Sequence, residues 1–461
     1  MRVLITGGSG LIGRALTENL VLDNHEVIIV SRTPETIMNL PSGVTAIGWD
    51  KKTLVKHMEN VNAAVNLAGA SIAGESPLKM RWSPKRKHRI LQSRVDAGNK
   101  LSEAIKTVNK KPEVLIQSSA VGYYGPLSDE LVDENFPSGN DFLADVCQQW
   151  EDSTQPVESL GIRRPIVRTG LVFSSQGGIF PLLKLPFSLY VGGPLGNGKQ
   201  YLSWIHIDDV VQAIRFLIDN QTAQGIFNLS SPNPVTNKDF GAILGKAMKR
   251  PSLFPVPSFA MKAALGETAT LSLDGQRVMP KRLLETGYNF KYSTLEGSFV
   301  SLLNPILNFK HEFQVNATLQ QVVDFHRDTI VLKKLTPFPI IVQFRQVEPV
   351  GEGTQALFTL WFGPIPVTWH ANHHDFNLPN SFFDTQVEGP FNLWVHQHSF
   401  NKIDDKMTEV VDDIDVQFGT GLFSGLVSRF MWITLPILFA YRAWQTKRLL
   451  EMNTQKLLHQ S

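Results

Sequence analysis

The residues best suited to chemistry near the start of the chain are three glycines, Gly7, Gly10 and Gly13, in a G-x-x-G-x-x-G series. The series follows a strand-like apolar run and opens a helical one. Such glycines allow a tight turn, close approach of the backbone to a pyrophosphate, and close packing of helix on strand. The helix start then offers unpaired N–H groups and partial positive charge to phosphates. We predict a dinucleotide-binding turn that also includes Leu11 and Ile12.

A serine and an arginine end the next strand-like run, with Arg32 19 residues beyond Gly13. Sites for NAD usually place an acid here, where it holds the ribose 2′-hydroxyl. The hydroxyl of Ser31 and the guanidinium of Arg32 suit a 2′-phosphate instead, so we predict NADP as the cofactor. The alternative is a solvated arginine at a strand end. Asp50, after a third apolar run, is placed either to contact the adenine amino group or to cap a helix.

Short apolar runs alternate with helical patterns through the first two thirds of the chain. The predicted strands are Arg2–Thr6, Glu26–Val30, Ala63–Leu67, Val114–Gln117 and Pro165–Arg168. The predicted helices include Leu11–Leu22, Lys85–Val108 and Phe142–Leu160. This alternation indicates an α/β fold with a doubly wound parallel (Rossmann) sheet.

The pattern and the charge both change near residue 305. From His311 onward there are 11 basic and 15 acidic residues, against 33 and 27 before it. Alternating strands dominate there, followed by a long helix from about 421 to 458, which indicates an α+β domain. We predict a nucleotide-binding domain over 1–304, with substrate-side segments near 171–200 and 225–300, and a second domain over 309–461.

Composition excludes several classes of protein. The 461 residues are 43% hydrophobic and 19% charged, which is typical of globular domains, and a net charge of +2 argues against nucleic acid as a partner. The single cysteine, Cys147, excludes a disulfide framework and fits a reducing, cytoplasmic location. The apolar stretch 430–441 is shorter than the roughly 20 residues of a spanning helix, so we expect no membrane span.

Several further motifs follow one another along residues 1–300. They are Asn66-Leu67-Ala68-Gly69-Ala70, Arg81-Trp82, Ser93-Arg94, Ser118-Ser119-Ala120-Val121-Gly122-Tyr123-Tyr124-Gly125, Asp141-Phe142-Leu143, Trp150-Glu151, Gly192-Gly193-Pro194-Leu195-Gly196-Asn197-Gly198, Ser203-Trp204-Ile205-His206-Ile207-Asp208-Asp209 and Asp274–Leu283. With the glycine turn, they resemble the extended or atypical short-chain dehydrogenase/reductase superfamily. The nearest branch is that of nucleotide-sugar epimerase-like proteins, some labelled cell-division inhibitors. The resemblance implies that Leu67 and Ala68 lie against the ribose and nicotinamide. It also places Arg94 at the cofactor or its rim, with a surface helix arginine as the alternative.

The resemblance also shows what is missing from the usual catalytic set. Members of that superfamily use a serine or threonine with a Tyr-x-x-x-Lys pair, whose lysine lowers the tyrosine pKa. Here Leu143 and Cys147 stand at the tyrosine and lysine positions, and residues 1–300 contain no Tyr-x-x-x-Lys. We predict that Ser119 orients the substrate and that Tyr124 donates a proton in a reduction. Aromatic packing is the alternative for Tyr124.

The second domain resembles the SRPBCC or START-like superfamily, in which a curved sheet grips a long C-terminal helix around an apolar cavity. The residues that carry this resemblance are Pro364–Trp369, Phe382–Phe391, Trp394–Phe400 and Phe439–Arg442. Trp394, His396 and His398 share one strand face because strand side chains alternate. With Trp369, Phe383, Phe391 and Phe400 they are predicted to line a pocket for an apolar ligand, or else to form a half-exposed polar face. His370, His373 and His374 lack suitable acidic partners, so no metal site is predicted.

The sequence therefore predicts an NADP-dependent oxidoreductase or epimerase-like enzyme that acts on a small hydroxyl- or carbonyl-bearing substrate. A helix-grip module would bind that substrate, its product or an apolar ligand. The alternative is a non-catalytic NADP-binding sensor or cell-division-associated regulator.

Overall fold

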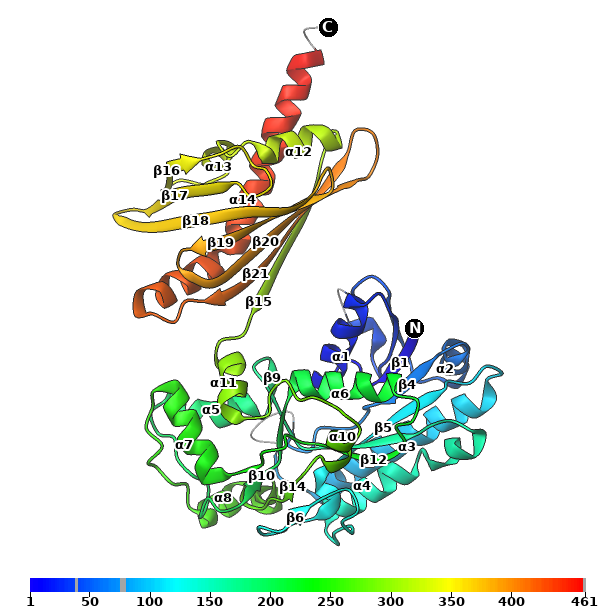
Figure 1. The fold of residues 1–461 in the computed structure, drawn as a ribbon. Coiled ribbons are helices and arrows are strands. Elements are labelled where there is room, and N and C mark those ends of the chain that lie inside the picture. Colours follow the sequence, from blue (N-terminus) through cyan, green and yellow to red (C-terminus); the bar gives the residue numbers. More distant parts are fainter. Residues whose placement is uncertain (38–39, 75–79, 459–461) are drawn as a thin grey trace. The chain divides into compact units, whose positions relative to one another are not determined.

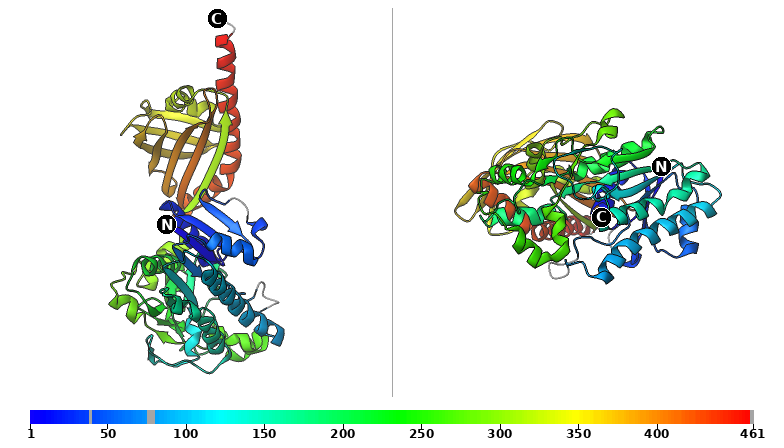
Figure 2. Two further views of the ribbon diagram at one scale, coloured as in Figure 1. Left: turned by 90° about the vertical axis from the view of Figure 1, so that its right-hand side faces the viewer. Right: turned by 90° about the horizontal axis from the view of Figure 1, so that it is seen from below.

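The chain divides into two compact units, Met1–Leu303 and Asn304–Ser461, in a computed structural model that describes residues 1–37, 40–74 and 80–458. The sequence places the boundary a few residues later, between 304 and 309. Figures 1 and 2 show a mixed α/β unit followed by a unit built on an antiparallel sheet.

The first unit is built on a seven-stranded parallel sheet. Its strands are β1 (Arg2–Thr6), β2 (Glu26–Val30), β3 (Val44–Ile47), β4 (Ala63–Asn66), β5 (Val114–Ala120), β7 (Pro165–Thr169) and β12 (Gly225–Leu229). Their order is β12-β7-β5-β4-β1-β2-β3, so the chain reverses direction across the sheet between β1 and β4. The predicted doubly wound sheet is confirmed. Ligands of such sheets bind at the carboxyl ends of the strands beside this reversal.

Helices cover both faces of the sheet, which explains why its strands are continuous apolar runs. One face packs on α1 (Leu11–Leu22) and α6 (Ile207–Asp219). The other packs on α2 (Lys51–Met58) and α3 (Pro84–Thr107), with α4 (Phe142–Asp152) beside α3. The core residues Leu4 and Ile5 are fully buried, one toward each helical layer.

Segments after β7 form a smaller layer near the carboxyl ends of the strands. Its elements are β8 (Leu171–Ser174), β9 (Gly177–Gly178), α5 (Phe180–Ser188), β10 (Tyr201–Leu202), β11 (Trp204–His206), β13 (Val235–Thr236), α7 (Asn237–Met248), α8 (Ser258–Leu265), α9 (Thr270–Leu273), β14 (Arg277–Val278), α10 (Lys281–Glu285) and α11 (Leu295–Leu303). A cluster of buried aromatic rings, including Phe173, Phe180 and Trp204, holds α5, α7 and α11 together. β14 also pairs with β6 (Leu131–Val132) of the preceding loop.

The second unit is a seven-stranded antiparallel sheet with the order β15-β21-β20-β19-β18-β17-β16. Its strands are β15 (Leu307–Val315), β16 (Ile340–Val347), β17 (Gln355–Phe362), β18 (Ile365–Asn377), β19 (Ser381–Glu388), β20 (Phe391–Lys402) and β21 (Thr408–Phe418). Two short helices, α12 (Leu319–Arg327) and α13 (Val331–Lys334), follow β15, and the long helix α14 (Leu422–Leu458) follows β21. Figure 1 shows α14 lying along the sheet.

Helix α14 has two different faces. Met431, Leu435 and Phe439 are buried against Trp369 and Trp394 of the sheet. The opposite face exposes apolar side chains, including Phe430, Ile433 and Ile437. By length and composition alone, Leu422–Glu451 would suffice to cross a membrane, with 28% of its most apolar window buried inside the unit. Core helices of soluble proteins meet the same criterion, so this is weak evidence for a membrane segment.

Candidate dinucleotide site and two pockets

The glycine turn brings backbone atoms closer together than any side chain would allow. Gly7 has a φ of 69°, and a Cβ there would lie 2.8 Å from the carbonyl oxygen of Leu67. A Cβ on Gly13 would lie 2.5 Å from the carbonyl oxygen of Gly7. Gly10 precedes the first residue of α1, and its N–H donates to the same Gly7 oxygen at 2.9 Å. Leu11 and Ile12 are thus the first residues of α1, and the start of this helix packs directly against the backbone of the glycine turn.

A buried chain of hydrogen bonds fixes the strand ends next to this turn. The Thr6 hydroxyl donates to Asn66 Oδ1 at 2.6 Å, and Asn66 Nδ2 donates to Gln117 Oε1 at 2.9 Å. These bonds tie together β1, β4 and β5, the strands that flank the reversal. Leu67 and Ala68 follow directly, so they lie beside Gly7, as the resemblance implies for the ribose and nicotinamide side.

The residues predicted to read the adenosine half follow β2 and β3. The Gly7 N–H donates to the carbonyl oxygen of Val30, the last residue of β2, at 3.4 Å. Ser31 and Arg32, which follow Val30, therefore lie next to the glycine turn. Ser31 is buried, whereas Arg32 is exposed and has no hydrogen bond or ion pair with the residues that the structure describes. Asp50 caps α2, where its carboxylate accepts the Thr53 N–H at 2.9 Å and its pKa is lowered by that bond. The cap interpretation of Asp50 is therefore correct, and its adenine contact stays a prediction.

Arg94 is a buried residue, so the surface alternative for it is wrong. Its Nη1 donates to the carbonyl oxygens of Ala70 at 3.1 Å and Ile90 at 2.9 Å. Its guanidinium lies 4.9 Å from the centre of the Trp150 ring. Burial lowers the pKa of Arg94 to about 10. The side chain holds the loop after β4 and forms part of a pocket wall.

Ser119, Leu143 and Cys147 stand at the usual catalytic positions, and their surroundings are mostly apolar. Cys147 is buried, its Sγ lies 3.6 Å from the Ala120 carbonyl oxygen, and burial raises its pKa to about 11. Ser119 is 3% exposed and lies beside that thiol, and its Oγ has no other partner among the described residues. Leu143 packs against Gly122. A neutral thiol and a leucine thus replace the lysine and the tyrosine.

Tyr124 is part of a buried structural network, and this position does not fit the predicted proton donor. It is 1% exposed, its hydroxyl donates to Asn228 Oδ1 at 2.7 Å, and it accepts from Arg168 Nη1 at 3.2 Å. Arg168 in turn forms a two-pronged ion pair with Glu151 at 2.9 and 3.0 Å. Burial raises the pKa of Tyr124 to about 12. The sequence missed Arg168, which lies on a separate strand and gives Tyr124 its structural role.

A pocket of about 330 Å³ lies at the carboxyl ends of β4, β5 and β7. Its wall near the strands includes Arg94, Ala120, Leu143 and Cys147, whereas Ser119 and Tyr124 do not line it. The wall from the smaller layer is formed by Ile179, Leu183, Leu195, Tyr201, Ser203, Asn237, Leu271, Asp274 and Gln276, among others. The lining is mostly apolar, which fits a small organic ligand that is oriented by few polar groups.

Among the described residues, two acids line this pocket, and they differ in what they bind. Asp141 caps α4, with its carboxylate accepting the Ala144 N–H at 2.8 Å. The carboxyl of Asp274 makes no hydrogen bond or ion pair with the described residues. Burial raises the pKa of Asp274, with Lys262 opposing the shift and Asp141 adding to it. Asp274 is thus the pocket acid that is free to exchange a proton.

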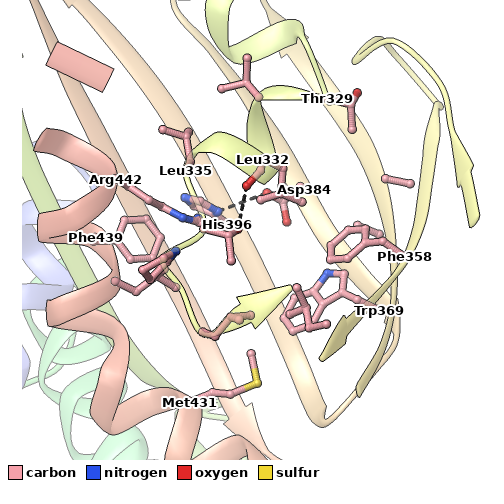
Figure 3. A pocket seen from close by; sticks show the side chains of 18 of the residues that line it. Thr329, Leu332, Leu335, Phe358, Trp369, Asp384, His396, Met431, Phe439 and Arg442 are labelled. Carbon is pink, nitrogen blue, oxygen red and sulfur yellow. Dashed lines mark hydrogen bonds and ion pairs between the residues drawn. The ribbon is translucent and has the colours of Figure 1, made fainter. Parts of the chain in front are cut away.

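A second pocket, also of about 330 Å³, lies inside the second unit (Figure 3). Four residues predicted to line it do so, namely Trp369, Trp394, His396 and His398. Phe383 does not, because its ring stacks on His374 on the other side of the sheet, and its neighbour Phe382 lines the pocket in its place. Phe391 and Phe400 are buried in the adjoining core without lining the pocket. The sequence missed Asp384 and Arg442, which also face the cavity.

Comparison with known proteins places the first unit. Residues 3–143 match the model of the NAD dependent epimerase/dehydratase family. An epimerase family protein of Staphylococcus aureus (strain MRSA252) is 39% identical over 305 residues, which are 65% of this chain and 98% of that protein. The chain belongs to the epimerase family. The resemblance predicted for residues 1–300 is thereby confirmed at the level of the epimerase/dehydratase family. Residues 256–301 match a domain of unknown function.

Solved structures agree with this assignment. The human epimerase family protein (isoform 2), crystallised with NADPH, is 34% identical, with a TM-score of 0.60 and coverage of 66% of this chain and 99% of that one. A nucleoside-diphosphate sugar epimerase from Corynebacterium glutamicum is 33% identical, with a TM-score of 0.52 and coverage of 66% of this chain and 58% of that one. Both likenesses cover about two thirds of this epimerase family member, and the START-like nature of its second unit stays a prediction.

Proposed function

We propose that the first unit binds NADP(H) and catalyses an oxidoreductase or epimerase-like reaction on a small hydroxyl- or carbonyl-bearing substrate. The observation that carries this proposal is the glycine turn, where a Cβ on Gly13 would collide with the backbone at 2.5 Å. The absence of side chains at this turn is required for a pyrophosphate to approach the start of the helix. The relative crystallised with NADPH supports the choice of cofactor, and the exposed Arg32 supplies a donor fork for a 2′-phosphate.

The residues around the strand ends would position the cofactor and the substrate. Leu67 and Ala68 would support the ribose, and Arg94 would keep the following loop in place through its bond to Ala70. Ser119 would orient the substrate oxygen once ligand binding opens the corner beside Cys147. When bound, NADPH supplies a hydride to the substrate carbon. The proton for the substrate oxygen must then come from a side chain that lines the pocket.

We assign that proton to Asp274 in place of Tyr124. Asp274 is exposed and lines the pocket, with its carboxyl uncommitted, and partial burial of the carboxyl raises its pKa. Tyr124 is committed to Arg168 and Asn228. In a reduction, hydride and proton together convert a carbonyl to an alcohol, and the reverse reaction would return the proton to Asp274.

The test is turnover of NADPH, followed by its absorbance, with a panel of small carbonyl compounds. We expect Asp274→Asn to abolish turnover and to leave NADPH binding unchanged. Asp145→Asn is the matched control, because Asp145 is an exposed acid of α4 outside the pocket. Turnover that survives Asp274→Asn would remove Asp274 from the mechanism.

The second candidate function is a sensor that binds NADP without chemistry. Leu143 and Cys147 favour it, since neither supplies the proton relay of the usual pair. Tight binding of NADPH together with no turnover on any compound of the panel would support the sensor over the enzyme.

For the second unit, we propose a helix-grip, START-like module that binds an apolar ligand between its sheet and α14. The pocket lined by Phe358, Trp369 and Trp394 supports this proposal. Calorimetric titration of the full chain with decan-1-ol tests it, and the absence of any binding would contradict it.

A further inference from the structure

The pocket of the second unit contains two histidines between two aspartates. His396 and His398 alternate on β20, and the sheet register places Asp384 opposite His396 and Asp412 opposite His398. His396 Nδ1 lies 3.2 Å from Asp384 Oδ2, and its Nε2 lies 3.0 Å from Asp412 Oδ1. His398 Nε2 lies 3.1 Å from Asp384 Oδ2, and its Nδ1 lies 3.1 Å from Asp412 Oδ1. Each imidazole therefore bridges both carboxylates.

The two imidazoles engage both carboxylates of this cluster. Burial would lower the pKa of His398, but its hydrogen bond to Asp384 and its ion pair with Asp412 outweigh burial and raise that pKa to about 9. The histidines likewise hold the pKa of both aspartates well below their usual value despite burial. Neither aspartate makes an ion pair with a lysine or an arginine among the described residues.

Arg442 of α14 adds a positive charge that nothing in the described part of the chain pairs. Its Nε is buried without a hydrogen-bond partner, and no ion pair involves this side chain among the described residues. Burial lowers the pKa of Arg442, opposed by the charges of Asp412 and Asp384. Figure 3 shows Arg442 directed toward His396 and Asp384, above Phe439. A charge enclosed by apolar groups is costly unless an opposite charge meets it.

Most of the remaining cavity wall is apolar, although Asp328, Thr329 and His373 also line it. Phe358, Trp369 and Met431 face the space away from Arg442 (Figure 3). The volume of about 330 Å³ lies within the range of small-molecule pockets. The site thus offers a guanidinium at one end and a mostly apolar wall beyond it.

We propose that this pocket binds an amphiphilic carboxylate, with its carboxylate group on Arg442 and its apolar chain against Phe358, Trp369 and Met431. This inference rests on the proposed ligand-binding function of the second unit. A guanidinium presents parallel N–H groups that match a carboxylate in geometry. The negative charge of the ligand meets the Arg442 guanidinium, which makes no ion pair with Asp384, Asp412 or any other described residue.

A divalent metal is the competing occupant. Ligand atoms of Asp384, His396 and His398 all lie within 4.8 Å of one another. A metal there would need ring nitrogens without hydrogen, which gives up contacts that the histidines make with the carboxylates. It would also add positive charge beside Arg442. Both effects favour the carboxylate.

The experiment is calorimetric titration of the full chain with decanoate, decan-1-ol and Zn²⁺ in separate runs. We expect decanoate to bind more tightly than decan-1-ol. Arg442→Met should weaken decanoate binding by about 10- to 100-fold, the usual loss of a charge-assisted pair, and leave decan-1-ol unchanged. Arg429→Met is the matched control, because Arg429 lies on the same helix with its guanidinium over Phe418 and outside the pocket.

Three other outcomes contradict the proposal, each in a distinct way. Equal affinity for decanoate and decan-1-ol in the unchanged chain would overturn carboxylate recognition but leave the apolar-ligand function. Binding of neither would overturn both. Zn²⁺ binding that His396→Gln abolishes and Arg442→Met preserves would assign a metal site instead. If Arg442→Met weakens both ligands, Arg442→Lys decides: a retained preference for decanoate supports the proposal, and a lost preference with intact decan-1-ol binding refutes it.

Discussion

Replacing Arg32 with alanine tests how the chain distinguishes NADPH from NADH. Arg32 follows Ser31 at the edge that the Gly7 turn shares with β2, and it has no partner in the described part of the chain. Its removal therefore changes little in the protein itself. A charge-assisted hydrogen bond is worth about 1.5–3 kcal/mol, which corresponds to about 10- to 150-fold in affinity. Because the side chain is exposed and its charge is screened, we expect the lower end, about 10- to 30-fold for NADPH.

The assay is calorimetric titration of both dinucleotides into the unchanged chain and into Arg32→Ala. NADH affinity should change by less than about twofold, since NADH lacks the 2′-phosphate. Added salt should narrow the gap between the two dinucleotides in the unchanged chain. Lys56→Ala is the charge-matched control, because this exposed lysine lies in the last turn of α2. Equal weakening of NADPH and NADH by Arg32→Ala, or no weakening of either, would refute the 2′-phosphate role.

Three further predictions follow from buried contacts. Tyr124→Phe leaves Arg168 and Asn228 without their shared partner, so it should lower the free energy of unfolding in urea by about 1–3 kcal/mol. NADPH affinity should not change. Loss of turnover at unchanged stability would restore the catalytic role of Tyr124. Gly13→Ala should reduce NADPH affinity at least about tenfold by turn distortion, whereas Gly297→Ala, where a Cβ would lie 3.4 Å from Thr294 Oγ1, should be tolerated. His398, which faces Asp384, Asp412, His396, His326 and His373, has its pKa raised from 6.5 to about 9, so its stabilisation is complete below pH 6.5 and is lost as the pH rises through 9. The difference in Tm between the unchanged chain and His398→Gln should therefore shrink from neutral to alkaline pH, and a constant difference would mean that His398 is not the titrating group.

Much of the first unit could be predicted from local pattern. The bounds of β1 and β2 agree with those predicted, because fully buried parallel strands are short runs of apolar residues. The helix predicted over Phe142–Leu160 is in fact α4, which ends at Asp152, followed by a 3₁₀ turn that begins at Gln155. Pro156 at the start of that turn explains the break. The predicted strands do not include β12, because its Gly225-Ile-Phe-Asn-Leu sequence mixes polar and apolar residues.

The sites depended on contacts that no local pattern encodes. Tyr124 follows β5 in a 3₁₀ turn, and only the position of Arg168 on β7 determines that its hydroxyl points into the core. Asp384 and Asp412 reach His396 and His398 through the register of two hairpins. A one-residue shift of either strand would turn these aspartates to the opposite face of the sheet.

Two buried arginines and the half-buried Arg442 show why pairing is the useful criterion for function. Arg168 is buried, but Glu151 and Tyr124 satisfy its guanidinium, so its role is complete without any ligand. Arg94 is satisfied in the same way by backbone carbonyl oxygens. Arg442 has no such partner among the described residues and faces an open cavity. Because a charge that is partly removed from water gains from an opposite charge, the unpaired Arg442 on a pocket wall indicates a ligand, whereas the paired Arg168 indicates a structural role.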